Sequence, residues 1–173
     1  TGGWTVSGVD TTGTRTIEGV TTAVTAVDAT GDWTLRAATL DGSVDATGTD
    51  GDWTIRAATV TTASAAPAVT ARGATGDWTV RAVAVTNDDG DAVGARATTG
   101  NWTLRNATIQ GAATDAVDAS DASGDWSVDD VDVSGVGESA LDADGTTGDW
   151  TVTNLTAETT GFDAVYVGET EGD

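Results

Sequence analysis

Apolar and polar residues alternate in short stretches along the whole chain. The stretch that begins at Trp102 reads WTLRNATI, so that Trp102, Leu104, Ala107 and Ile109 are apolar and most residues between them are polar. Alternation with a period of two is typical of a β-strand that buries one face. A third short stretch follows in the same repeat at Val117. The pattern predicts strands, because the sequence shows no apolar stripe with the 3.6-residue period of a helix.

These alternating stretches recur about every 24 residues. Each of the seven tryptophans is followed two residues later by an aliphatic residue, and the last four tryptophans are spaced 24 residues apart. A unit of this length that repeats along a chain indicates a solenoid. We therefore predict one domain over residues 1–173, with seven coils that start near Trp4, Trp33, Trp53, Trp78, Trp102, Trp126 and Trp150.

Each coil contains three short alternating stretches, separated by Gly, Asp, Thr and Ser. None is long enough to pair within its own coil, so each is expected to pair with the equivalent stretches of the neighbouring coils. This predicts an all-β, parallel β-solenoid of triangular section. With a rise of about 4.8 Å per coil, seven coils would form a rod roughly 34 Å long.

The phrase WTLRNATI, with a turn between its two strand halves, resembles the repeats of right-handed parallel β-helix proteins of the pectate-lyase-like fold, variants of which are common on the surfaces of haloarchaea. The resemblance covers essentially the whole chain. It implies a right-handed solenoid, in agreement with the usual handedness of parallel crossovers. It also implies a partial ladder of amides at the turn, where Asn106, Asp130 and Asn154 match the family and Ala37, Ala57 and Ala82 depart from it.

The chain is strongly acidic, with 28 acids, seven arginines, no lysine and a net charge of −21. Such a surface makes nucleic acid an improbable partner. Together with the excess of Asp over Glu, it resembles proteins of halophilic archaea. The absence of Cys and His from the sequence argues against disulfides and zinc chemistry, and we expect no metal and no cofactor. No apolar run is long enough for a membrane span.

The tryptophans are the first candidate site. Each shares parity with the inward aliphatic residue two positions later, which favours a buried structural ladder of stacked rings. An exposed ladder that binds sugar rings is the alternative, and it would make the protein a surface adhesin or a glycan-binding segment. A buried ladder would give blue-shifted, protected fluorescence.

Acidic residues are the second candidate. An Asp column precedes the tryptophans, and turn formation is its simplest role. An Arg column four residues later could interleave with it; the members are Asp32, Asp52, Asp77, Asn101, Asp125 and Asp149, and Arg36, Arg56, Arg81 and Arg105. The cluster Asn87–Asp91 has oxygen ligands at calcium-like density but matches no complete binding loop, so Asp88, Asp89 and Asp91 are expected to form a hydrated loop, with a weak calcium site as the alternative.

Three sequons, at Asn101, Asn106 and Asn154, are candidate N-glycosylation sites and favour an extracellular or cell-surface location. No repeat carries the long loop that would wall a catalytic cleft, so we expect no enzyme activity and no catalytic residue.

The two ends of the repeat array suggest an assembly. The repeat phrase begins at the first residues, the last repeat is complete at Asp173, and neither end shows a polar cap. Residues up to Arg105 carry 12 acids and seven arginines (net −5), whereas the rest carries 16 acids and no base (net −16). We therefore expect the structural subunit of an extracellular filament, a homopolymer stacked head to tail; a piece of a longer array is the other interpretation.

Overall fold

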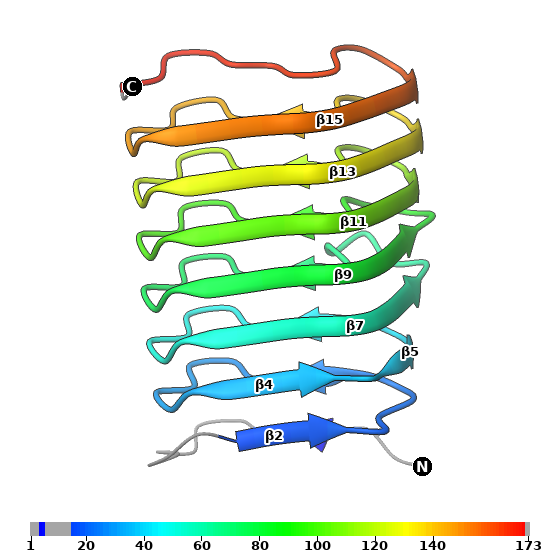
Figure 1. Cartoon of the computed structure of the whole chain (residues 1–173), viewed down its shortest axis with the longest axis vertical. Helices are drawn as coiled ribbons and strands as arrows, with labels where there is room; N and C mark the ends of the chain where they lie inside the picture. The colour runs from blue at the N-terminus through cyan, green and yellow to red at the C-terminus, as the bar shows by residue number, and fades with distance from the viewer. Residues whose placement is uncertain (1–3, 6–14, 172–173) are drawn as a thin grey trace.

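The computed structural model describes residues 4–5 and 15–171, and in these residues the chain forms a parallel β-solenoid without helices. Figure 1 shows the coils stacked one above another, with the long strands on one side of the rod. The solenoid has about six turns of about 24 residues. The predicted all-β solenoid fold is therefore confirmed, with one turn fewer than the seven that the tryptophans indicated.

Two parallel sheets run along the rod. The sheet of long strands contains β2 (Arg15–Glu18), β4 (Trp33–Arg36), β5 (Thr39–Asp41), β7 (Trp53–Thr62), β9 (Trp78–Asn87), β11 (Trp102–Ala112), β13 (Trp126–Val136) and β15 (Trp150–Thr160). The sheet of short strands contains β1 (Trp4–Thr5), β3 (Val24–Thr25), β6 (Val44–Asp45), β8 (Val69–Thr70), β10 (Val93–Gly94), β12 (Val117–Asp118) and β14 (Leu141–Asp142).

The first two predicted stretches of each repeat join into one long strand from β7 onward. The residue four positions after each tryptophan from Trp33 to Trp150 has a left-handed backbone, with φ of 51° at Ala57, 52° at Ala82 and 48° at Asn106. This residue bends the strand without ending it, because the pairing resumes at the next residue, where Ala58 pairs with Val83. The position that the sequence marked as a turn is therefore a bend within a continuous strand.

The core consists of columns of apolar side chains that run along the rod, one column for each inward-facing position of the coil. Leu35, Ile55, Val80 and Leu104 are fully buried in successive coils, as are Val44, Val93 and their neighbours on the short strands. Because every coil has the same type of residue at the same position, each inward side chain packs on the equivalent side chain of the neighbouring coil. Alternation within the coil and repetition between coils therefore specify the same core.

A column of glycines allows the coils to approach closely just before the tryptophans. A Cβ atom placed on Gly100 would lie 2.1 Å from the carbonyl oxygen of Gly76, and one on Gly124 would lie 2.3 Å from that of Gly100. No side chain fits such a contact between backbones. This explains why a glycine stands two residues before the tryptophan in coil after coil.

The first coil differs from the prediction. Trp4 pairs with Val24 in the sheet of short strands, and Arg15, rather than Trp4, lies beside Trp33. The coil start predicted at Trp4 is therefore wrong, because Thr16-Ile17-Glu18 supplies the alternation that matches β4. The aliphatic residue predicted at Val6 lies outside the described residues.

Candidate functional site

Six of the seven tryptophans form one continuous stack inside the rod. The ring centroids of neighbouring tryptophans lie 4.9–5.5 Å apart, and their planes differ by 1–12°. The five indoles from Trp33 to Trp126 are only 2–5% exposed, whereas Trp150 in the last coil is half-buried. The faces of the five buried rings contact one another and the core, so they are not offered to a sugar ring.

The indole N–H groups of this Trp column are mostly without an acceptor. Trp53 Nε1 donates to Thr49 Oγ1 at 3.1 Å, but the indole nitrogens of four others, Trp33, Trp78, Trp102 and Trp126, are buried with no hydrogen-bond partner in the described part of the chain. The position four residues before the tryptophan is alanine in three of these four coils. The column is therefore stabilised by ring stacking and burial more than by polar contacts.

The Asp column forms a ladder of hydrogen bonds to the backbone. Each Oδ1 accepts the backbone N–H of the equivalent residue in the next coil: Asp52 N–H to Asp32 at 3.0 Å, Asp77 N–H to Asp52 at 2.9 Å, and onward to Asp149. Asn101 fits the same ladder, because an amide oxygen accepts the same bond. The sequence suggested a turn role for these residues but not their bonds between coils.

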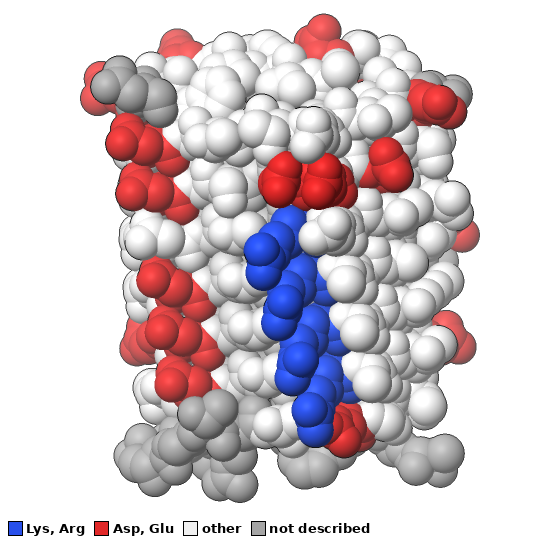
Figure 2. Space-filling model, in the orientation of Figure 1, with Lys and Arg blue, Asp and Glu red and all other residues white. Residues whose placement is uncertain are grey.

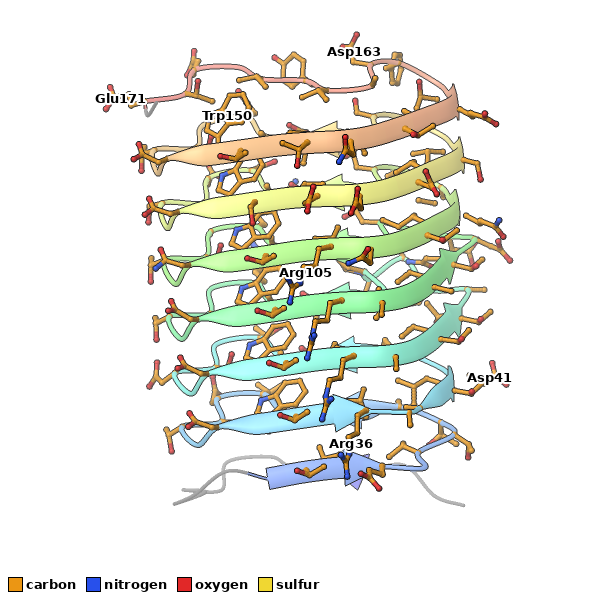
Figure 3. The ribbon with its side chains drawn as sticks, viewed as in Figure 1. Arg36, Asp41, Arg105, Trp150, Asp163 and Glu171 are labelled. Atoms are coloured by element: carbon orange, nitrogen blue, oxygen red, sulfur yellow. The ribbon has the colours of Figure 1, made fainter. Side chains whose placement is uncertain are left out.

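The Arg column stands apart from the Asp column on the same outer face. Arg36, Arg56, Arg81 and Arg105 are neighbours in register, and Figure 2 shows a blue stripe along the rod with a red stripe beside it. Figure 3 shows Arg36 and Arg105 projecting from the long strands. The predicted interleaving of the two columns is therefore wrong, since residues four apart in an extended strand are separated by roughly 13 Å.

Within the column itself, acids adjoin the arginines in register only at the two ends of the Arg column, as far as the described residues show. Glu18 forms an ion pair with Arg36, and Asp129 pairs in register with Arg105. Among the described residues, no ion pair or hydrogen bond engages the side chains of Arg56, Arg81 and Arg105. In a chain of net charge −21, these half-buried or exposed arginines are a locally uncompensated basic surface.

A shallow groove of about 890 Å³ runs along the rod beside the tryptophan positions. It is lined by the Asp column, the tryptophans from Trp33 to Trp150 and a Thr column of Thr34, Thr54, Thr79, Thr103, Ser127 and Thr151. Since the Asp and Thr side chains point outward while the indoles are buried, the acidic and hydroxyl columns form the two walls. The groove is polar, long and open along its length.

A second, more buried acidic column lies beside the short strands. The backbone N–H of Asp115 donates to Asp91 Oδ1 at 3.2 Å, and that of Ser139 donates to Asp115 Oδ1 at 2.9 Å. Asp115 is 8% exposed, and burial raises its pKa to about 6. Burial also raises the pKa of Asp142. Asp91 and Asp115 join neighbouring coils through these two bonds, and burial disfavours the charged form of Asp115 and Asp142.

The candidate calcium loop is organised by an amide. Asn87 is fully buried, accepts the backbone N–H of Ser64 at 3.1 Å, and donates to the carbonyls of Ala66 and Asp91 at 3.0 and 2.8 Å. Within the described residues no three acidic side chains gather as a metal ion would require. Asn87 therefore joins this loop to the loop of the preceding coil, a role that sequence reasoning missed.

The three sequon asparagines are exposed. Asn101 belongs to the Asp column, and Asn106 and Asn154 occupy the bend of the long strand. In that bend Asn154 Nδ2 donates to Asp130 Oδ1 at 2.9 Å, which is one rung of the partial ladder.

The C-terminal end of the rod exposes apolar residues. Phe162 is 73% exposed, and Val165, Tyr166 and Val167 are exposed as well. In the sheet of long strands, β15 pairs only with β13, so one edge of an eleven-residue strand has no strand partner among the described residues. Figure 1 shows this strand and the segment that follows it at one end of the stack.

Fold and surface define a repeat protein of the parallel β-solenoid class. Comparison of the chain with protein-family models, with curated proteins and with solved structures gave no match. None of the described residues belongs to a helix that is long and apolar enough to cross a membrane.

Proposed function

We propose that the chain is a structural subunit of an extracellular filament, in which β-solenoids stack head to tail. The observation that carries this proposal is the last described coil, where Phe162 and Tyr166 are exposed and one edge of β15 has no strand partner among the described residues. Exposed strand edges offer unpaired N–H and C=O groups, and a second solenoid offers the same spacing of partners. A contact of this kind does not close on itself and therefore propagates.

Apolar burial provides the driving force in the proposed contact. Covering a side chain of the size of Phe162 contributes roughly 1.5–3 kcal/mol. The half-buried indole of Trp150, which ends the Trp column, would gain a neighbour on its free side. The proposed role needs no catalytic group, and we propose none; the buried rings of the Trp column give the adhesin alternative no support.

The acidic composition supports a halophilic, archaeal and cell-surface setting. In molar salt the Debye length is about 3 Å, so repulsion between chains of net charge −21 is screened. Salting-out ions also strengthen apolar burial. Filament growth is therefore expected to increase with salt concentration.

The test compares two single-charge variants in molar salt by light scattering and electron microscopy. Phe162→Asp places a charge on the apolar end, and it should prevent filament growth without changing the fold, because Phe162 is exposed. Thr108→Asp is the matched control, since Thr108 is exposed on the side of the rod and the next coil carries Asp132 at the same position. If the wild type stays monomeric, or if both variants assemble equally, the proposal is wrong.

A further inference from the structure

We propose that two copies of this solenoid pair side by side, parallel and related by a two-fold axis along the rod, with the Arg column of each copy in the Asp–Thr groove of the other. The charged face itself supports this inference. This side-by-side pairing is distinct from end-to-end stacking and would occur between single rods, although stacking of the rods would strengthen the pairing.

The three outward columns have a simple symmetry. In the coils of Trp33, Trp53 and Trp78 the acid lies two residues before the threonine and the arginine two residues after it, as in Asp77, Thr79 and Arg81. The Thr column is therefore the midline, with the acidic and basic columns roughly 6–7 Å to either side. Figure 2 shows the red and blue stripes on one face.

Only one way of facing two such surfaces brings opposite charges together. Rotation by 180° about an axis parallel to the rod exchanges left and right, so that each Arg column faces the Asp column of the other copy. Rotation about an axis across the rod would instead place arginine opposite arginine. Charge complementarity therefore selects the parallel pair.

The heights of the charges also match. In the parallel pair Arg36 faces Asp32, Arg56 faces Asp52 and Arg81 faces Asp77, because the members of each pair come from the same coil. Since both rods have the same spacing between strands, all of these Arg–Asp pairs align simultaneously. In the next coil Arg105 would face Asn101, and the match ends one coil beyond that, where Asp129 would face the acid Asp125.

Shape supports the same arrangement. The groove lies between the Asp and Thr columns, where the arginines of a facing copy would enter. Three arginines of each copy, Arg56, Arg81 and Arg105, engage no acid within the described part of their own chain, so pairing would not break an ion pair. Isologous contact would give each of them a polar partner, with Arg105 facing Asn101.

The area of this contact is small. A strip roughly 13 Å wide over four coils lies well below the roughly 800 Å² per partner of a standard interface. Isolated rods are therefore expected to pair weakly. In stacked rods the Arg–Asp pairs repeat with every subunit, so multivalency strengthens the contact. This gain in affinity is the one part of the inference that rests on the proposed filament.

Cysteine cross-linking tests the two-fold axis directly, because the chain has no cysteine of its own. Thr79 lies on the proposed axis and would meet the Thr79 of the second copy. Under mild oxidation, Thr79→Cys should form disulfide dimers roughly tenfold faster than Thr59→Cys, since pairing raises the effective concentration of the facing thiols. Thr59 is an exposed control on the part of the long strand beyond the bend.

Charge variants in the Thr79→Cys background test the ion pairs. R56D/R81D should reduce cross-linking to the rate of the control. Asn101→Asp should increase the rate, because it places a carboxylate opposite Arg105 and retains the ladder hydrogen bond from Asp125. Circular dichroism checks the fold of each variant.

Three results would overturn the inference. Cross-linking at position 79 could be no faster than at position 59, or it could be unaffected by R56D/R81D. Alternatively, the wild type could bind dextran sulfate through Arg56 and Arg81 while the Thr79→Cys rate equals that of the control, which would assign the Arg column to an anionic polymer. The cross-linking experiment uses single soluble rods and no filaments. Its results are therefore independent of whether Phe162 supports end-to-end growth.

Discussion

Replacing Asp115 by asparagine is expected to stabilise the solenoid at neutral pH. The Asp115 carboxylate accepts the backbone N–H of Ser139 at 2.9 Å, and it does so from a site that is only 8% exposed. Burial raises its pKa from 3.8 to about 6, so the ionised form is disfavoured in the folded chain. An asparagine retains the acceptor oxygen and removes the charge.

The size of the effect follows from the pKa shift. A change from 3.8 to about 6 is about two pKa units, and each unit corresponds to about 1.36 kcal/mol, which gives roughly 3 kcal/mol. Because the folded-state pKa is raised, the stabilisation from protonated Asp115 is fully present below about pH 3.8. It is lost as the pH rises through about 6. Asp115→Asn should therefore raise the free energy of unfolding by roughly 2–3 kcal/mol at pH 7.5 and leave it nearly unchanged near pH 4.

Urea denaturation at constant high salt, at both pH values, measures this difference. Asp125→Asn is the matched control, because Asp125 also accepts one backbone N–H from the next coil but is exposed. The control should change stability by less than about 0.5 kcal/mol at either pH. An equal gain for Asp115→Asn at both pH values, or a loss at pH 7.5, would refute the assignment of the pKa shift to burial.

Three further predictions concern the fold. Ala57→Asn should stabilise the chain by about 1 kcal/mol in urea denaturation, since Ala57 has φ of 51° and asparagine tolerates this conformation; no gain would contradict the bend. Gly100→Ala should destabilise by about 3 kcal/mol or more, because its Cβ would lie 2.1 Å from the Gly76 carbonyl oxygen, and a neutral result would exclude this close approach. Thr49→Val should cost about 1–3 kcal/mol by leaving Trp53 Nε1 unpaired, and a thermal melt that matches the wild type would contradict it.

Alternation and repeat length predicted most of the fold, because each coil repeats the same inward positions. The bend was also visible in the sequence, since Asn106, Asp130 and Asn154 tolerate a left-handed backbone where the coils of Trp33, Trp53 and Trp78 have alanine. The first coil was not predictable from the tryptophans. In that coil Arg15 occupies the position of the tryptophan, and Ile17 lies in register with Leu35. The alternation of apolar and polar residues therefore locates this coil, whereas the position of a tryptophan does not.

The surface was less predictable than the core. The sequence gives the outward columns but not the contacts between coils, such as the bond from Asp77 N–H to Asp52, which depend on the register in space. It also suggested that acids and arginines interleave, although an extended strand holds Asp77 and Arg81 apart on one face. The sequence drew attention to the cluster Asn87–Asp91 but not to the role of Asn87 in joining two loops, because its partners Ser64 and Ala66 lie in the loop of another coil.

Electron cryomicroscopy of the wild-type protein in molar salt tests the central claim, head-to-tail stacking, most directly. The predicted result is filaments in which the coil spacing of about 4.8 Å continues across subunit boundaries, with Phe162, Tyr166 and the edge of β15 buried at each boundary. Monodisperse monomers under these conditions, or filaments in which the edge of β15 stays exposed, would contradict it.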